Sequence, residues 1–220
     1  VEMVNPILIV ALPLGAAFLL PLAARLGKAA SAALFYAALL AVAAIAGQWT
    51  YILVAAGGDA ARIFTAGARP PLSIELAMGP VEAALVFGAA LVALAGSVYM
   101  HREMEGPRDR ALVLLFVLGA SGIVMTRDVF NLFVFLEILS ISSYALVAAD
   151  GSRRATAAAF KYAVAGSIAS IAFLLGTILL YAQTGTLGLD GMIARGAPTR
   201  RRRAPSRWPE TASSRRRARA

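Results

Sequence analysis

Residues 129–149 read VFNLFVFLEILSISSYALVAA, an apolar stretch with a single ionisable residue, Glu137, close to its middle. About 20 apolar residues are enough to cross about 30 Å of hydrocarbon as a helix. An acidic side chain at the centre of such a helix costs roughly 2.5–3.5 kcal/mol on insertion scales. The stretch therefore predicts a membrane-spanning helix, with Glu137 as a candidate for ion or proton handling.

The rest of the chain has the composition of a membrane protein. Of its 220 residues, 60% are hydrophobic and 15% charged, and the mean hydropathy is +0.74. We therefore predict an all-α integral membrane protein with about six transmembrane helices, in a helical domain over residues 1–190. The predicted spans are residues 6–24, 29–56, 83–100, 111–126, 129–149 and 156–182.

The net charge of +9 arises at one end of the chain. Residues 1–190 carry 11 Lys or Arg and 11 Asp or Glu, whereas residues 191–220 carry 10 Arg and one Glu. We expect this Arg-rich tail to be disordered, because it has no apolar periodicity. Its abrupt start is also what a GC-rich gene yields when read out of frame. The alternative is a genuine polybasic arm that binds anionic lipid or nucleic acid; for the protein as a whole we expect no nucleic-acid partner.

The chain has no cysteine and a single histidine, His101. Disulfides, iron–sulfur clusters and thiolate zinc sites are therefore excluded, and a His-rich metal or haem site is disfavoured. We expect no cofactor, no metal and no redox centre in this chain.

The loops predict an orientation in the membrane. An outside N-terminus places more basic residues on inside connections than on outside ones, as the positive-inside rule requires. The predicted inside residues are Arg25, Lys28, Arg102, Arg108, Arg110, Arg153 and Arg154, against Arg62, Arg69 and Arg127 outside. Residues 57–80, rich in Gly and Pro, predict an ordered outside loop containing a small hairpin.

Two hydroxyl residues share a helix face with Glu137. At about 3.6 residues per turn, Ser140 and Tyr144 continue its polar stripe toward the inside end, as a proton path requires. Lys161 lies in the next, antiparallel span. A buried carboxylate and ammonium stabilise each other's charge when close, so Glu137 and Lys161 are a candidate switchable pair, either in direct contact or linked through water or Tyr144. The structural alternative is a buried polar pair that only fixes helix register.

The stretch TRDVFNLFVFLEILSISSYALVA, residues 126–148, and AAAFKYAVAGSIASIAFLLGTILLYAQTGTL, residues 157–187, carry a specific resemblance. They resemble the antiporter-like membrane subunits shared by respiratory complex I, membrane-bound hydrogenases and Mrp-type sodium/proton antiporters. The resemblance covers about residues 111–190, and more weakly the loop with PPLSIEL. It implies that Glu137 is central to proton translocation and that Lys161 belongs to the same buried polar axis.

The resemblance also implies a fold of about fourteen helices in two inverted repeats, of which this chain would be the N-terminal part. The leading hypothesis is a truncated proton-translocating subunit, part of a cation/proton antiporter or a redox-driven pump of the NADH:quinone oxidoreductase or hydrogenase type. Its expected partners are other membrane subunits, the bilayer, protons and, in an antiporter, Na+. The expected location is a prokaryotic inner membrane. The alternative is a membrane scaffold with a basic tail that binds lipid or a partner.

Overall fold

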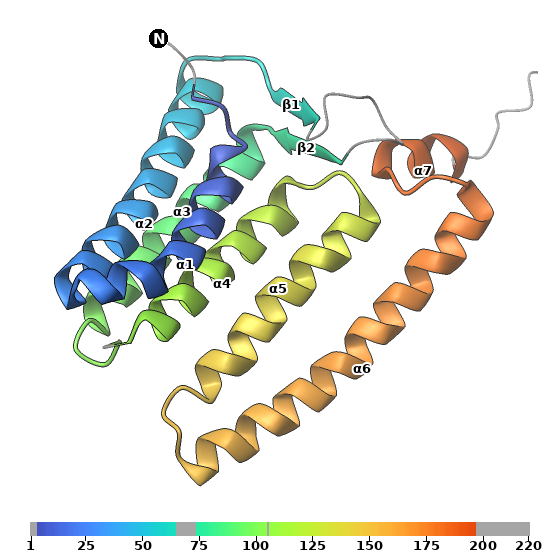
Figure 1. Ribbon diagram of the computed structural model, residues 1–220. Helices are drawn as coiled ribbons and strands as arrows, with labels where there is room; N and C mark the ends of the chain where they lie inside the picture. The colour runs from blue at the N-terminus through green and yellow to red at the C-terminus, as the bar shows by residue number, and fades with distance from the viewer. Residues whose placement is uncertain (1–3, 65–73, 105, 197–220) are drawn as a thin grey trace, which may run out of the picture.

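The computed structural model describes residues 4–64, 74–104 and 106–196. The Arg-rich tail beyond residue 196 and Arg69 of the loop lie outside the described residues. Six long helices follow the six predicted spans closely (Figure 1). They are α1 (Leu8–Leu26), α2 (Lys28–Thr50, continued by the π-helical turn η1, Tyr51–Ala55), α3 (Pro80–Tyr99), α4 (Pro107–Met125), α5 (Val129–Val147) and α6 (Arg153–Thr184).

Five of these helices are long and apolar enough to cross a membrane: α1, α2 with η1, α3, α5 and α6. In α4 the charged residues Arg108, Asp109 and Arg110 occupy the first turn. The Arg110 side chain is buried, and its guanidinium donates to Ser31 Oγ at 3.1 Å instead of extending to the surface. The fourth predicted span is therefore a helix whose charged end is held against α2.

Helices α1 to α4 form the core of the molecule. Large side chains on all four helices are fully buried, because apolar side chains pack closely against one another in the interior of a protein. They include Leu20, Phe35, Trp49, Val86, Leu114 and Leu118. Helix α5 packs on α4, and α6 packs on α5 at the edge of the molecule (Figure 1). Most of the apolar side chains of α6 are exposed.

A small sheet closes one end of the bundle. Strand β1 (Ala61–Phe64) pairs antiparallel with β2 (Glu75–Met78), which confirms the predicted hairpin between residues 57 and 80. The connections before α5 and after α6 extend this sheet, because Arg127 N donates to Glu75 O and Leu189 N to Arg127 O, both at 2.9 Å. The sheet therefore ties the start of α5 and the end of α6 to the hairpin.

A short helix, α7 (Leu189–Gly196), lies beside this sheet (Figure 1). The predicted disorder is therefore wrong for residues 191–196. Gly185 ends α6 with φ of +64°, and Arg195 donates to Thr184 O, so the chain turns back after α6. These tertiary contacts hold residues 191–196 in a helix, although the composition of this segment alone does not predict one.

Arg62 links α7 to the hairpin. Its Nη1 lies 2.7 Å from Glu75 Oε1 and 2.9 Å from Asp190 Oδ2. The hydrogen bond that Arg62 donates to Asp190, and next the one that it donates to Glu75, raises the pKa of Arg62 above its ordinary value. The bridge is exposed, so it positions α7 more than it stabilises the whole fold.

We expect Arg62→Gln to loosen α7 without unfolding the bundle. Hydrogen exchange measured by mass spectrometry should show severalfold faster exchange over residues 189–196 and unchanged exchange in α2 and α4. Arg25→Gln removes an exposed arginine at the opposite end and serves as the control. Equal exchange of α7 in the two variants would contradict the linking role of Arg62.

Candidate functional site

Helix α5 carries the candidate site and has two packed faces. It begins at Asp128, whose side chain accepts from Asn131 N at 2.8 Å and caps the helix, as an Asp at this position commonly does. One face packs on α4, where Leu139 lies against Gly119 and Phe135 against Gly122. These two glycines let the helices approach closely.

The opposite face of α5 packs on α6 through aromatic rings. Phe133 stacks on Phe173 with ring centroids 6.4 Å apart, and Tyr144 meets the Tyr162 ring edge-on at 4.7 Å. The Tyr144 hydroxyl lies directly over Gly166, so that an added Cβ there would overlap it. These contacts fix the register between the two antiparallel helices.

Glu137 lies on the α6-facing side of α5. It is four residues after Phe133 and seven before Tyr144, and both spacings return to the same helix face. In the register of the aromatic contacts, Glu137 is level with about residue 170 of α6. Ser170 is there, and it is buried. The site is therefore a seam between α5 and α6.

The carboxyl group of Glu137 has one buried oxygen without a hydrogen-bond partner among the described residues. The residue as a whole is half-buried, but its Oε1 is inaccessible and has no hydrogen-bond partner among the described residues. A buried polar atom without a partner costs about 1–3 kcal/mol, more if it is charged. Such a cost is commonly retained at functional sites, where the group binds a proton, an ion or water.

The two predicted supporting residues, Ser140 and Tyr144, lie at different heights along this seam. Ser140 is half-buried, one turn along α5 from Glu137, as expected from the helix period. Tyr144, one turn further, is held between Tyr162 and Gly166. Both therefore lie on the α6-facing side toward the α5–α6 turn. Ser142 and Ser143 instead donate to backbone carbonyls one turn back, at Ile138 and Leu139.

Lys161 does not pair with Glu137 in the described chain. Its side chain is exposed on α6, and no described contact joins it to a carboxylate. In the observed register Lys161 is level with residues 145–149, which is about 12 Å or more from Glu137 along the helix axis at about 1.5 Å per residue. The aromatic contacts between α5 and α6 set this offset. Glu137 and Lys161 are therefore not in direct contact in this arrangement.

Three further residues of the seam, Tyr162, Gly166 and Ser170, have only weak signals in the sequence. The spacing of Gly166 and Ser170 indicates a surface where helices approach closely, and the structure places Tyr144 on it. Tyr162 directly follows Lys161 and has no separate signal. Within the described ranges, no group of three or more His, Cys, Asp or Glu side chains is placed to hold a metal ion.

Comparison with known proteins identifies the family. Residues 126–201, which include α5, α6 and α7, match the family model described as NADH:quinone oxidoreductase/Mrp antiporter, transmembrane. NADH-quinone oxidoreductase subunit N of Desulforudis audaxviator is 39% identical over 190 residues, covering 84% of this chain and 38% of that protein. The chain belongs to this antiporter-like family of membrane subunits.

Other relatives carry different names. A subunit of the Na(+)/H(+) antiporter of Bacillus subtilis is 34% identical over 127 residues, which are 56% of this chain and 26% of that protein. The chain thus spans less than two fifths of the length of both of these curated relatives. The Glu137, Ser140, Tyr144 and Lys161 positions all lie within the part that matches the family model.

Solved structures of this family have the same helix arrangement. A chain of the membrane-bound sulfane sulfur reductase, an archaeal respiratory membrane complex, superposes with a TM-score of 0.79 at 34% identity, over 86% of this chain and 39% of that one. A chain of the Mrp complex from Dietzia sp. gives 0.73 at 26% identity, over 86% and 38%. Both structures are multi-subunit membrane complexes.

The seam also predicts a sharp packing effect at Gly166. In Gly166→Ala the new Cβ would overlap the Tyr144 hydroxyl and lie 2.6 Å from its Cζ, so Tyr144 must leave its position. We expect a loss of stability of about 1–3 kcal/mol, measured by thermal or detergent unfolding. Adding Tyr144→Phe removes the closest atom and should recover part of that loss. A double variant as unstable as the sum of the single ones would contradict this contact.

Proposed function

We propose that the protein translocates protons as an antiporter-like subunit and that Glu137 is its proton acceptor within the membrane. The observation that carries this proposal is the buried, unpartnered Oε1 of Glu137 in the α5–α6 seam. An ionised carboxylate in that position lowers its free energy by taking up a proton, which makes it neutral, or by binding a water or a cation. Exchange between these forms is a proton uptake and release cycle.

Hydroxyl groups near Glu137 supply a path. Ser170 lies level with it on α6, Ser140 lies one turn away on α5, and Tyr144 follows toward the α5–α6 turn. Hydroxyls both donate and accept hydrogen bonds, so a row of them can relay a proton with intervening water. We infer that protons reach Glu137 along this row from the end of the molecule at the α5–α6 turn.

Lys161 has a longer-range role in this proposal. It lies about 12 Å or more from Glu137 along the helix axis, near the inner end of the row. In a poorly screened membrane interior the electrostatic field of a positive charge at this distance still reaches the carboxyl group and the protons that arrive there. Lys161 therefore acts as an electrostatic modulator, and its exposed position lets further helices reach it.

The names of the relatives suggest two kinds of assembly. One relative is a subunit of an NADH-quinone oxidoreductase, and the other is a subunit of a Na(+)/H(+) antiporter. We propose that this protein likewise works among other membrane subunits, in a prokaryotic inner membrane with its N-terminus outside. The larger number of Lys and Arg residues on the connections at the other end of the bundle supports this orientation.

Proton flux through the complete protein reconstituted in vesicles tests this proposal, with Glu137→Gln compared to the wild type. Lost flux with unchanged assembly supports proton transfer at Glu137. Unchanged flux contradicts it. Loss of assembly together with flux would instead favour the scaffold alternative, in which the buried carboxyl only fixes helix packing.

A further inference from the structure

Helix α1 joins α2, and α3 joins α4, at the same end of the bundle (Figure 1). A polar pocket lies at this end. It has a volume of about 500 Å³ and is lined by Lys28, Ala29, Ala32, His101, Arg102 and Arg110. Its lining side chains are therefore basic or small. A pocket of this size and charge fits a phosphate group with its attached glycerol.

Two of the basic side chains are held in place by neighbouring helices. Arg110 is 6% exposed, and its Nη1 donates to Ser31 Oγ at 3.1 Å, a neutral partner. The His101 ring Nδ1 lies 2.8 Å from the hydroxyl of Tyr36, which also donates to Ser97 O at 3.0 Å. Among the described residues, no carboxylate lies within ion-pair distance of the Arg110 guanidinium. Its buried charge is therefore left without a described counter-ion.

The start of α2 adds to the positive field of the pocket. This helix of 23 residues begins after Gly27 with no side-chain cap and no acidic residue in its first turn. The first N–H groups of a helix have no intrahelical acceptor and carry a partial positive charge. Residues Lys28, Ala29 and Ala32 of these first turns line the pocket. The N-terminal end of α2 and the buried Arg110 side chain therefore both favour an anion in this pocket.

We propose that this pocket binds the phosphate of an anionic phospholipid headgroup. Two membrane spans, α1 and α3, end at this pocket and the span of α2 begins at it, so it lies where headgroups are found. Basic pockets between membrane helices are common sites for anionic headgroups. The proposal concerns a different part of the molecule from Glu137 and does not depend on proton transport.

Native mass spectrometry of the complete protein in detergent tests this site. The probes are phosphatidylglycerol, phosphatidylcholine and inorganic phosphate. We expect phosphatidylglycerol to bind at least about tenfold more tightly than phosphatidylcholine, and Arg102→Gln to weaken its binding about fivefold, the effect of one basic residue near a headgroup. Lys28→Gln with Arg102→Gln should weaken it further.

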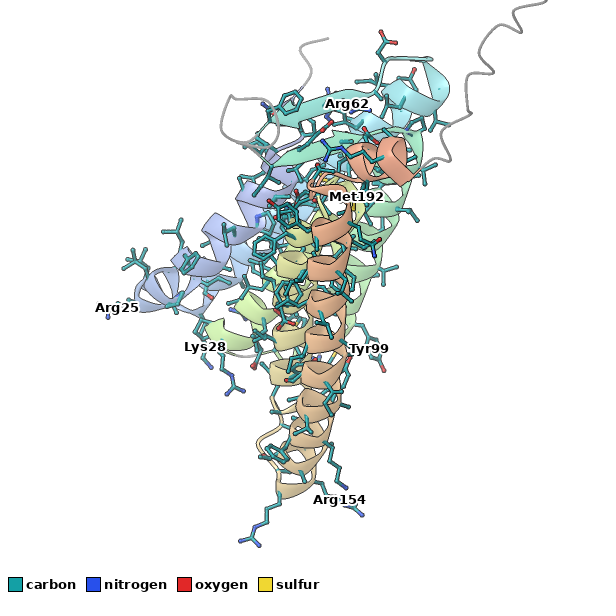
Figure 2. The ribbon with its side chains drawn as sticks, turned by 90° about the vertical axis from the view of Figure 1, so that its right-hand side faces the viewer. Arg25, Lys28, Arg62, Tyr99, Arg154 and Met192 are labelled. Carbon is teal, nitrogen blue, oxygen red and sulfur yellow. The ribbon has the colours of Figure 1, made fainter. Side chains whose placement is uncertain are left out.

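The control variant combines Arg153→Gln and Arg154→Gln, which removes two charges at the α5–α6 turn, outside the pocket (Figure 2). Phosphatidylglycerol binding within twofold of the wild type in this control supports the proposal. An equal loss in control and pocket variants would overturn it, since only general surface charge would then matter. Displacement of phosphatidylglycerol by equimolar inorganic phosphate would also overturn it, because the site would then hold free phosphate.

Discussion

Glu137→Gln in the complete protein is expected to lower proton flux by about 10² or more, the typical contribution of a positioned acid–base group. Glutamine keeps the size of the side chain and its capacity for hydrogen bonds, but it neither binds nor releases a proton. The buried Oε1 would be replaced by a neutral group in the same α5–α6 seam. Flux measured from a pH-sensitive dye inside vesicles gives the rate directly.

Two comparisons make this result specific to proton transfer. Ser140→Ala, one turn from Glu137, removes a relay hydroxyl that a water can replace, so its flux should fall much less than that of Glu137→Gln. Purification yield and unfolding temperature should be unchanged in both variants. A Glu137→Gln protein that keeps wild-type flux would rule out Glu137 as the acceptor, whatever its stability.

The largest effect on stability is expected from Gly119→Ala. A Cβ at residue 119 would lie 2.8 Å from the backbone N of Leu139 and 3.0 Å from its Cα. Backbone atoms in the middle of a helix cannot move aside alone, so α5 must shift away from α4. We expect a loss of about 2–3 kcal/mol or more in the free energy of unfolding, measured by thermal or detergent unfolding.

Gly15→Ala is the matched control for this substitution. Gly15 also lies inside a membrane helix, α1, but an added Cβ there meets nothing within 4 Å. It should leave stability unchanged or raise it by up to about 1 kcal/mol, because Ala favours a helix over Gly. If the two variants lose the same amount of stability, the close approach of α4 and α5 at Gly119 is not what holds them together.

Much of the fold follows from local pattern. Apolar runs of the right length predict the six long helices, and the Gly- and Pro-rich loop predicts a hairpin. These features depend on neighbouring residues in the chain and on the hydrocarbon thickness. Helix α7 and the extension of the hairpin sheet at Arg127 and Leu189 depend on distant segments, and no local pattern indicates them.

The candidate site follows from local pattern only in part, for the same reason. The helix period places Glu137, Ser140 and Tyr144 on one face of α5, and the structure turns that face toward α6. The offset between the two helices depends instead on how Phe133 stacks on Phe173 and Tyr144 packs on Tyr162. These contacts put Ser170, and not Lys161, level with Glu137. Side-chain fit between helices is a tertiary property that spacing along one chain does not determine.

Infrared difference spectroscopy of the complete protein tests most directly whether Glu137 takes up a proton within the membrane. Spectra are recorded as a proton gradient is applied and removed, for the wild type and for Glu137→Gln. We predict a carbonyl band of a protonated carboxylic acid that appears with proton uptake in the wild type and is absent in the variant. The same band in both proteins would contradict the assignment of Glu137 as the proton acceptor.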